Sequence, residues 1–458
     1  MSEFDAEEQA DYARAAELAY RELLSRQGEG APQPRLEPTR RVVELLGDVH
    51  RSYPVIHVAG TNGKTSTSRM IESILRAYSL RTGLFTSPHL TRFNERIMID
   101  GEPIRNDALV ANWLDVKPYI ELVDKELEVK GEPRLTYFEA LTVLAFASFA
   151  DAPVDVAIIE VGMGGEWDST NVADGAVAVF TPIDLDHTDK LGDTIEAIAR
   201  TKSGIIKPSA FVVSAAQSPE ALEVLREATT LTESPLYVVG EHATIDQADV
   251  AVGGQLISVT GISGTYPEIY LSLFGDHQSQ NAALAILAVE AFLGGGDIAL
   301  DPDVLAEAFG TVTSPGRLQI IATEPTVLVD AAHNPHGARA LAEALTSYFT
   351  FDDITLVIGV LDDKDAAGIL ENIAPHVDRI IVTTAPSERG RDADEIRDLA
   401  VNILGEDRVL TVQDPTEAIA RAREFAAQHQ HGAVVVTGSI TLVGLAVSEA
   451  ELSQGWSA

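Results

Sequence analysis

The sequence predicts an α/β protein with two domains, and three observations support that prediction. Short runs of β-branched and apolar residues alternate with helix-length amphipathic stretches, which is typical of parallel strands that helices bury on both faces. The chain has 458 residues, enough for two or three domains. Hydrophobic residues make up 45% of it and charged residues 22%, so wholesale disorder is excluded.

The first part of the chain begins with a helix and a break, and a series of strands follows. Residues 4–26 have the spacing of an amphipathic helix, and the Gly- and Pro-rich segment 28–34 ends it. That helix fits an appendage or a lid equally well. Apolar runs then predict buried strands at 55–59, 154–161, 176–183 and 211–214.

A second series of strands follows a change of pattern. Between 236 and 275 apolar and polar residues alternate, which predicts a short antiparallel stretch. Turn residues at 313–316 mark a boundary. Strand-like runs resume at 327–330, 354–360, 379–384, 408–412 and 433–438. We therefore expect a helix and linker at 1–34, a first α/β domain at 35–314 and a second at 315–458.

Charge and cysteine content exclude several classes of protein. The chain has 33 Lys and Arg against 70 Asp and Glu, a formal net charge of −37. Nucleic acid is not an expected partner, because phosphate binding of that kind needs clustered basic residues. With no cysteine, disulfides and thiolate chemistry are excluded. No signal peptide or membrane span is expected, and a cytoplasmic location is the simplest expectation.

A glycine-rich loop follows the first predicted strand and opens a helix. It reads Gly60, Thr61, Asn62, Gly63, Lys64, Thr65 and Ser66. Such a loop turns backbone N–H groups toward an anion, the lysine reaches terminal phosphates, and Thr65 or Ser66 would hold Mg²⁺. Only two residues precede Gly63-Lys64, where the usual phosphate loop has four. The alternative is a glycine-rich turn with an incidental lysine, but the strand–turn–helix context favours phosphate binding.

Two further strands end in residues suited to a metal ion. Glu160 closes one buried strand, and Asp184-Leu185-Asp186-His187 follows the next. A buried carboxylate is costly without a cation or a partner, and the carboxyl ends of parallel strands line the ligand crevice. Glu160 and His187 therefore predict a Mg²⁺ site, with phosphate oxygens completing the shell. The alternative is a loop cap and an ordinary loop histidine.

Two nearby features, the segment 162–165 and Lys202, give weaker indications of a binding site. The segment 162–165 is glycine-rich, but position 167 is Trp and no helix pattern opens there, so we reject a dinucleotide site. Lys202 ends a helix pattern. From the residues alone it is best interpreted as a solvated surface lysine, and the other possibilities are a phosphate contact or a side chain carbamylated by CO₂.

Ten short segments together resemble one known family. In order they are GTNGKTS (60–66), FTSPHL (85–90), ERI (95–97), TYFEALT (136–142), EVGMGGEWDSTN (160–171), DHTDKLGDT (186–194), KSGIIK (202–207), GDHQSQNA (275–282), PGR (315–317) and DAAHNPHG (330–337). On these segments the chain resembles the bifunctional dihydrofolate synthase/folylpolyglutamate synthases, a branch of the Mur ligase superfamily. The resemblance implies a Mur-ligase-like architecture: an N-terminal P-loop ATPase-like domain with a mostly parallel sheet, and a C-terminal Rossmann-like domain.

The resemblance also implies a reaction. ATP would phosphorylate a carboxylate of dihydropteroate or of a reduced folate, and the amine of L-glutamate would displace phosphate from the acyl phosphate. ATP, L-glutamate, dihydropteroate and reduced folates are the expected small-molecule partners. Mg²⁺ is the implied cofactor, together with a monovalent cation and a carbamylated Lys202. The family leads us to expect a monomer.

The family's site residues carry over by matching position. Lys64 and the Gly63 turn would hold the phosphates, and Ser66, Ser87, Glu160, His187 and carbamylated Lys202 would surround the metal. Asn281 would contact adenine, Asp330 the ribose, Arg317 the phosphates and His333 the reacting centre. The pterin site would fall on Leu36, Glu37, Thr136, Tyr137, Phe138, Glu139, Trp167, Asp168 and Ser169.

Three alternatives to this function stay open at this point. The enzyme would extend folates only and not use dihydropteroate, or it would be a Mur ligase that adds an amino acid to a UDP-sugar peptide. About 50 residues precede the phosphate loop, too few for a UDP-binding domain. The third alternative is a nucleotide-binding switch without ligase chemistry, which would not need His187 and Lys202.

Overall fold

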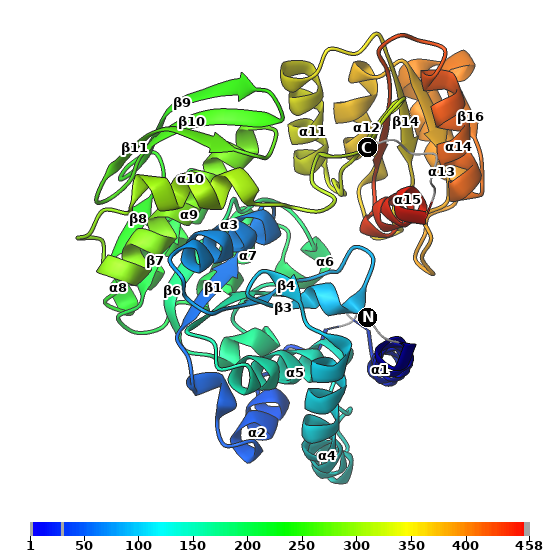
Figure 1. Ribbon diagram of the computed structural model, residues 1–458. Coiled ribbons are helices and arrows are strands. Elements are labelled where there is room, and N and C mark those ends of the chain that lie inside the picture. Colours follow the sequence, from blue (N-terminus) through cyan, green and yellow to red (C-terminus); the bar gives the residue numbers. More distant parts are fainter. Residues whose placement is uncertain (1–2, 29–31, 453–458) are drawn as a thin grey trace. The chain divides into compact units, whose positions relative to one another are not determined.

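The computed structural model describes residues 3–28 and 32–452, with side chains from residue 8 onward (Figure 1). Residues 29–31 of the expected linker lie outside the described residues. The chain divides into two compact units. The first comprises 1–247, 257–269 and 280–312, and the second comprises 248–256, 270–279 and 313–458.

An eight-stranded sheet forms the centre of the first unit. Its order is β4 (Glu102–Pro103), β3 (Ile97–Ile99), β2 (Thr82–Phe85), β5 (Val156–Glu160), β1 (Val55–Ala59), β6 (Gly175–Phe180), β7 (Phe211–Ser214) and β8 (Leu236–Val238). From β2 to β8 all neighbours are parallel, whereas β3 pairs antiparallel with both β2 and β4. Every residue of β1 and β5 is buried, as a sheet covered on both faces requires.

Helices pack around this sheet. They are α1 (Glu3–Leu24), α2 (Glu37–Leu45), α3 (Lys64–Ala77), α4 (Asn106–Lys130), α5 (Tyr137–Asp151), α6 (Thr188–Leu191), α7 (Ile195–Ser203), α8 (Pro219–Leu231), α9 (Asp276–Gly294) and α10 (Pro302–Thr311). Short 3₁₀ turns are η1 (Val49–Arg51), η2 (Phe93–Arg96) and η3 (Ser169–Val172). A three-stranded sheet, in the order β11 (Thr265–Leu271), β10 (Gly254–Thr260) and β9 (Thr244–Ala251), occupies the region of the predicted antiparallel stretch.

The second unit has a six-stranded sheet. Its order is β12 (Gln319–Thr323), β13 (Thr326–Val329), β17 (Gly432–Thr437), β14 (Asp353–Ile358), β15 (Arg379–Val382) and β16 (Val409–Thr411), parallel apart from the β12–β13 pair. Its helices are α11 (Pro335–Tyr348), α12 (Ala366–Ile373), α13 (Ala393–Leu404), α14 (Pro415–Ala426) and α15 (Ile440–Leu452), with 3₁₀ turns η4 (Ala374–His376) and η5 (Glu406–Arg408). The predicted class, two mostly parallel α/β sheets, is confirmed.

The N-terminal helix is part of the core of the first unit. Leu23 of α1 is fully buried, in one hydrophobic cluster with Trp113 and Ile120 of α4. α1 packs along α4 and also touches α5. The helix predicted at 4–26 is therefore present, and its inner face is joined to the domain. Within the described ranges no helix is long and apolar enough to cross a membrane.

Candidate functional site

The glycine-rich loop connects β1 to α3 in a conformation that glycine permits. Gly60 has φ 147° and Gly63 has φ 84°, both in the region that side chains disfavour. A Cβ on Gly60 would lie 1.9 Å from Thr181 Oγ1, and one on Gly63 would lie 2.6 Å from Asn281 Oδ1. Asn281, predicted to contact adenine, therefore lies directly against the phosphate loop.

The loop is also joined to the segment that follows β6. Thr61 N donates to Pro182 O at 2.9 Å, and the Thr61 hydroxyl and the backbone of Asp184 bond in both directions at 3.0 Å. Lys64 Nζ donates to Gly60 O at 3.2 Å and to Thr61 O at 3.1 Å. The lysine thus folds over the loop at the N-terminus of α3, where backbone N–H groups and the helix dipole favour an anion.

Four neighbouring parallel strands deliver the predicted metal-site residues to one sheet edge. In spatial order β2, β5, β1 and β6 lead to Ser87, Glu160, the phosphate loop and His187. Glu160 is 1% exposed, and the Thr65 hydroxyl donates to its two oxygens at 3.1 and 2.9 Å. Since hydroxyl and carboxylate oxygens are ligands that Mg²⁺ accepts, this edge suits that ion.

His187 caps the short helix α6 from an unusual backbone conformation. Its φ is 50°, and its Nε2 lies 3.8 Å from Asp186 Oδ2. Among the residues that the structure describes, no group of three His, Asp or Glu side chains converges into a metal site. A Mg²⁺ ion at this edge would therefore need oxygens from hydroxyls, water or phosphate, which is its usual mode of binding.

Lys202 is buried, so the interpretation as a solvated surface lysine is wrong. The residue is only 4% exposed. Its Nζ donates to Gly60 O at 2.8 Å, and Lys64 Nζ donates to the same carbonyl. Burial first, and the neighbouring Lys64 cation second, lower the pKa of Lys202 to about 7. Its surroundings therefore favour the neutral amine more than those of an exposed lysine do.

Close backbone packing brings Lys202 inside. A Cβ on Gly165 would lie 2.6 Å from Lys202 O, and one on Gly204 would lie 2.5 Å from Glu166 Cα. Glu166 N donates to Thr201 O at 2.8 Å, and Asn171 Nδ2 donates to Glu166 O and Gly204 O. The loop 162–171 is therefore fastened to the end of α7.

Two residues of the predicted pterin site stabilise the start of α5. Thr136 Oγ1 accepts from Glu139 N at 3.2 Å, and Glu139 Oε2 accepts from Thr136 N at 2.7 Å, a capping box. Arg35 forms an ion pair with Glu139, with Nε 2.9 Å from Oε1. The side chains of Thr136 and Glu139 thus hold the loop and helix in place.

The aromatic residues of that predicted site lie close to the glycine loop after β5. A Cβ on Gly162 would meet the Phe138 ring at 2.6 Å, and Phe138 also contacts Phe85. Tyr137 is buried beneath the Arg96 guanidinium, 5.4 Å from its ring centre. Trp167 is half-buried against the cluster that contains Leu191.

Asp168 and Ser169 are both buried, and their side chains bond within the protein. Asp168 accepts from Met163 N at 2.9 Å, from Thr170 N at 3.0 Å and from the Thr170 hydroxyl. Ser169 Oγ and Thr142 Oγ1 are 2.7 Å apart, linking the loop to α5. Asp168 therefore organises the loop 162–171.

The other predicted pterin residues lie at the start of α2. Leu36 precedes the helix and packs partly against the core of the first unit. Glu37 is exposed and lies 3.7 Å from Arg40. Pro38, at the second position of the helix, is buried and fixes this start.

Three predicted site residues belong to the second unit: Asp330 and Arg317, predicted for the nucleotide, and His333, predicted for the reacting centre. Asp330, at the end of β13, accepts from Leu318 N and Ala332 N, both at 2.8 Å. Arg317 is half-buried and donates to Gly316 O at 3.3 Å. The Nδ1 atom of His333 lies 2.9 Å from Ala331 O. Asp330 thus joins the turn before β12 to the end of β13.

Glu95 is a positioning residue that was not predicted. Glu95 accepts hydrogen bonds from Leu90 N, Arg92 N and both the amide and hydroxyl of Thr91, which lowers its pKa against the effect of burial. It thereby fixes the segment after Ser87. Its motif, ERI, was visible in the sequence, but nothing in the motif indicates which backbone groups it would hold.

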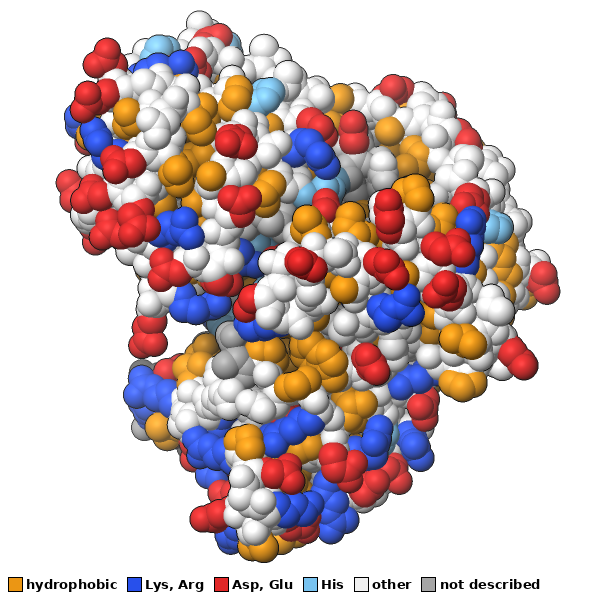
Figure 2. Space-filling model, turned by 180° about the vertical axis from the view of Figure 1, so that it is seen from behind, with side chains coloured by type: hydrophobic (Ala, Val, Ile, Leu, Met, Phe, Trp, Pro, Cys, Tyr) orange, Lys and Arg blue, Asp and Glu red, His pale blue; other side chains and the backbone are white. Residues whose placement is uncertain are grey.

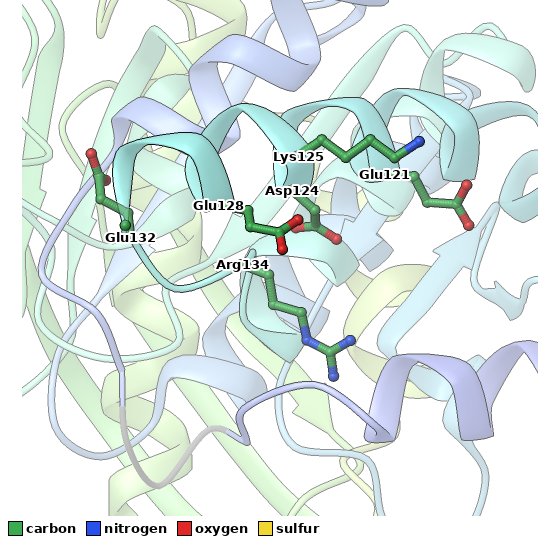
Figure 3. Close-up of a pocket in the computed structure, with 7 residues that line it drawn as sticks. Glu121, Asp124, Lys125, Glu128, Glu132 and Arg134 are labelled. Carbon is green, nitrogen blue, oxygen red and sulfur yellow. The ribbon is translucent and has the colours of Figure 1, made fainter.

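Figure 3 shows a pocket of about 520 Å³ that contains none of the predicted residues. It lies along the last turns of α4 and the following loop. Its lining is charged: Glu121, Asp124, Lys125, Glu128, Gly131, Glu132 and Arg134. Asp124 is already paired with Arg26 at 2.8 Å, and Arg134 donates to Ser25 O, so these contacts fasten the end of α1.

Comparison with protein families gives two matches. The Mur ligase middle domain matches residues 58–289, and the Mur ligase glutamate ligase domain matches residues 316–440. A dihydrofolate synthase/folylpolyglutamate synthase from Mycobacterium tuberculosis is 42% identical over 440 residues, covering 91% of this chain and 90% of that protein. Its Escherichia coli counterpart is 33% identical over 393 residues, with 85% and 86% covered.

Solved structures give the same result. The Mycobacterium tuberculosis folylpolyglutamate synthase complexed with ADP has a TM-score of 0.92 and 40% identity, covering 96% of this chain and 99% of that chain. An E. coli protein solved in complex with DHPP and ADP has a TM-score of 0.78 and 30% identity, covering 92% and 94%.

Proposed function

The chain belongs to the dihydrofolate synthase/folylpolyglutamate synthase family of Mur ligases, ATP-dependent enzymes, and from this premise we propose that it adds L-glutamate to both dihydropteroate and tetrahydrofolates. Relatives named for both activities and relatives named for folylpolyglutamate synthesis alone resemble it. The UDP-peptide ligase and the nucleotide switch are disfavoured by this family membership.

The observation on which the proposal chiefly rests is the pair of lysines on one carbonyl. Lys64 and Lys202 both donate to Gly60 O, and the lysine buried behind the loop has a pKa of about 7. A neutral amine can attack CO₂, forming an N–C bond and releasing one proton to give a carbamate. We propose that Lys202 is carbamylated in this way, which would replace a repelling cation by an anion beside Lys64.

The residues at the sheet edge fit Mg²⁺. Glu160 and a Lys202 carbamate would supply anionic oxygens, with Ser66 or Ser87 and His187 completing the protein's share. The half-buried Thr65 hydroxyl donates a hydrogen bond to Glu160. It would give up that bond when Glu160 binds the metal ion. When bound, the ion would offset the negative charge of ATP and an anionic substrate. A monovalent cation is a further proposal.

The reaction needs an activated carboxylate. The substrate's carboxylate oxygen would attack the γ-phosphorus of ATP, and ADP would leave. The glutamate amine would then attack the acyl carbon, the amide C–N bond would form, and phosphate would leave with the former carboxylate oxygen. Lys64 and the α3 N-terminus would stabilise the phosphates, because both present positive charge at the loop.

The proposed folate pocket uses aromatic faces and a fixed loop. Phe138 and Trp167 present half-buried aromatic surface beside Gly162–Gly165, and Tyr137 and Ser169 support them. Leu36 and Glu37 would close the other side, while Thr136, Glu139 and Asp168 hold the backbone. Asn281, Arg317, Asp330 and His333 keep their proposed nucleotide and reaction-centre roles. A monomer working in the cytoplasm also stays a prediction.

The test is a paired assay with purified protein, Mg-ATP and L-glutamate. Dihydropteroate is added to one reaction and tetrahydrofolate to the other, and phosphate release and product mass are followed. We expect both substrates to gain one glutamyl residue for each phosphate released. A gain with tetrahydrofolate alone would reduce the function to polyglutamylation, and no gain with either would contradict the folate assignment.

A further inference from the structure

A histidine in the middle of β1 has no part in the chemistry described so far. His57 is fully buried, between Ile159 of β5 and Ala178 of β6 in the sheet. Such a position is normally filled by an aliphatic residue, because a polar group there must find a partner. The ring Nε2 of His57 lies 2.9 Å from Thr170 Oγ1.

The direction of the hydrogen bonds follows from the groups present. The Thr170 hydroxyl has one proton, which it donates to Asp168 Oδ1. Its oxygen must therefore accept the proton of His57 Nε2–H. In this tautomer Nδ1 carries no proton, and Nδ1 has no hydrogen-bond partner among the described residues.

The hydrogen-bond chain from His57 through Thr170 to Asp168, here called the relay, continues into the loop 162–171. Asp168 accepts from Met163 N at 2.9 Å and from Thr170 N at 3.0 Å, so it closes the loop on itself. The last residue of the loop is held separately, since Lys207 Nζ donates to Asn171 O at 2.9 Å. Besides its bonds to α5 and to the end of α7, the loop therefore has two further supports, the buried ring of His57 and the Lys207 amine.

The imidazole ring of His57 stays neutral at pH values near 7. Burial, with the Lys207 cation second, lowers the pKa of His57 to about 3. The donor at Nε2 is therefore always present, and the relay is a fixed support that pH does not switch.

We propose that His57 is a positioning residue for the folate pocket, acting through Thr170 and Asp168 to hold the loop that carries Trp167 and Ser169. The proposal rests on the proposed function, because the loop is assigned to the pterin on that basis. The hydrogen bond of His57 leads to Thr170 and from there to the loop, so we expect the effect of His57 at the loop.

The test compares variants that break or keep the same hydrogen bond. His57→Phe and Thr170→Val each break the hydrogen bond between residues 57 and 170. His57→Gln keeps an N–H donor at the position of Nε2. The double variant His57→Phe/Thr170→Val removes both partners of that hydrogen bond. His50→Phe is the matched control, since His50 is also buried but packs on Phe146. Hydrogen exchange of the peptide 162–172 is measured without substrate, and KM is measured for dihydropteroate and ATP.

Each relay variant should raise the exchange rate of the 162–172 amides and the KM for dihydropteroate by about tenfold, and leave the KM for ATP within about twofold. The double variant should match the single ones, because residues in one hydrogen-bond chain do not act additively. His57→Gln and His50→Phe should resemble wild type in exchange rate.

Three results would overturn the proposal: unchanged exchange in both single variants, additive effects in the double variant, or a His57→Gln variant as impaired as His57→Phe. The exchange measurement needs no folate. If wild type failed to glutamylate dihydropteroate, the proposed function would fail while the exchange data still decided whether His57 holds the loop.

Discussion

Two lysine amines share one backbone carbonyl, and that arrangement makes Lys202 chemically distinct from the other lysines. Gly60 O accepts from Lys64 Nζ at 3.2 Å and from Lys202 Nζ at 2.8 Å. Burial disfavours the charged amine of Lys202, and repulsion from the Lys64 cation adds to this, so the pKa of Lys202 is lowered. A neutral lysine amine can serve as a nucleophile toward CO₂. The burial of Lys202 thus gives a physical reason for the carbamylation that the sequence resemblance implies.

Replacing Lys202 tests this role. For Lys202→Ala we expect kcat to fall by about a hundredfold or more, because the oxygen ligand that a carbamate would provide is lost. Affinity for ATP should change little, since Lys64 and the loop stay in place. The measurement is steady-state turnover with tetrahydrofolate beside ATP titration, with Lys117→Ala, a surface lysine paired with Glu22, as the control. Turnover at the wild-type level would remove Lys202 from the mechanism.

The burial of His57 leads to a second prediction, on how the free energy of unfolding depends on pH. Its folded pKa is about 3 and its unfolded pKa about 6.5, so between those values only the unfolded chain binds the proton. Stability must then fall as pH falls, by about 1.4 kcal/mol per pH unit for this group. Relative to His57→Gln, wild type should lose about 2 kcal/mol between pH 6.5 and 5 in urea unfolding. Parallel curves for the two proteins would contradict this.

At the scale of elements, the core of the first unit extends into its first helix. Leu23 of α1 is fully buried in the cluster that contains Trp113 of α4. Ion pairs reinforce the contact, since Arg26 pairs with Asp124, and Lys117 with Glu22. Gln27 O also accepts from Tyr137 N at 2.9 Å, which joins the end of the helix region to the start of α5.

Truncating the buried leucine tests the attachment of α1. Leu23→Ala should lower the free energy of unfolding by about 2–5 kcal/mol, as loss of a fully buried leucine side chain does. Leu18→Ala, on the exposed side of the same helix, should change it by less than about 0.5 kcal/mol. Urea unfolding measures both, and equal effects would show that α1 is not part of the core.

Strands buried on both faces were predictable from the sequence, and short irregular ones were not. β1 and β7 lie at their predicted residues, β5 and β17 lie within two residues of theirs, and β6 ends three residues before its predicted end. β2 was missed, although it leads to Ser87. Its sequence, TGLF, contains Gly83, which allows the Phe149 ring to approach; an added Cβ would lie 2.6 Å from that ring. The strand therefore depends on packing against α5, which a local pattern does not show.

The candidate site was predictable in its residue types more than in their contacts. The phosphate loop, Glu160 and His187 follow from strand ends alone. The burial of Lys202 does not, because it depends on Gly165 and Gly204 meeting another segment. The capping role of Glu139 was likewise hidden, since TYFE fits a ligand platform and a capping box equally well.

At the scale of the whole molecule, acidity dominates. The formal net charge is −37, and Figure 2 shows acidic side chains over much of the face in view. Like charges destabilise a compact state, and salt screens them over about 10 Å at 0.1 M and 3 Å at 1 M. The melting temperature should therefore rise as KCl is increased from about 0.05 to 1 M. A melting temperature that stays constant or falls would show that surface repulsion is not limiting.

In the proposed reaction a folate carboxylate is activated as an acyl phosphate before glutamate attacks it. The most direct measurement uses dihydropteroate labelled with ¹⁸O in its carboxylate, with Mg-ATP and L-glutamate, and mass analysis of the phosphate released. We expect one ¹⁸O atom in phosphate for each amide bond formed. Amide formation with unlabelled phosphate would contradict it.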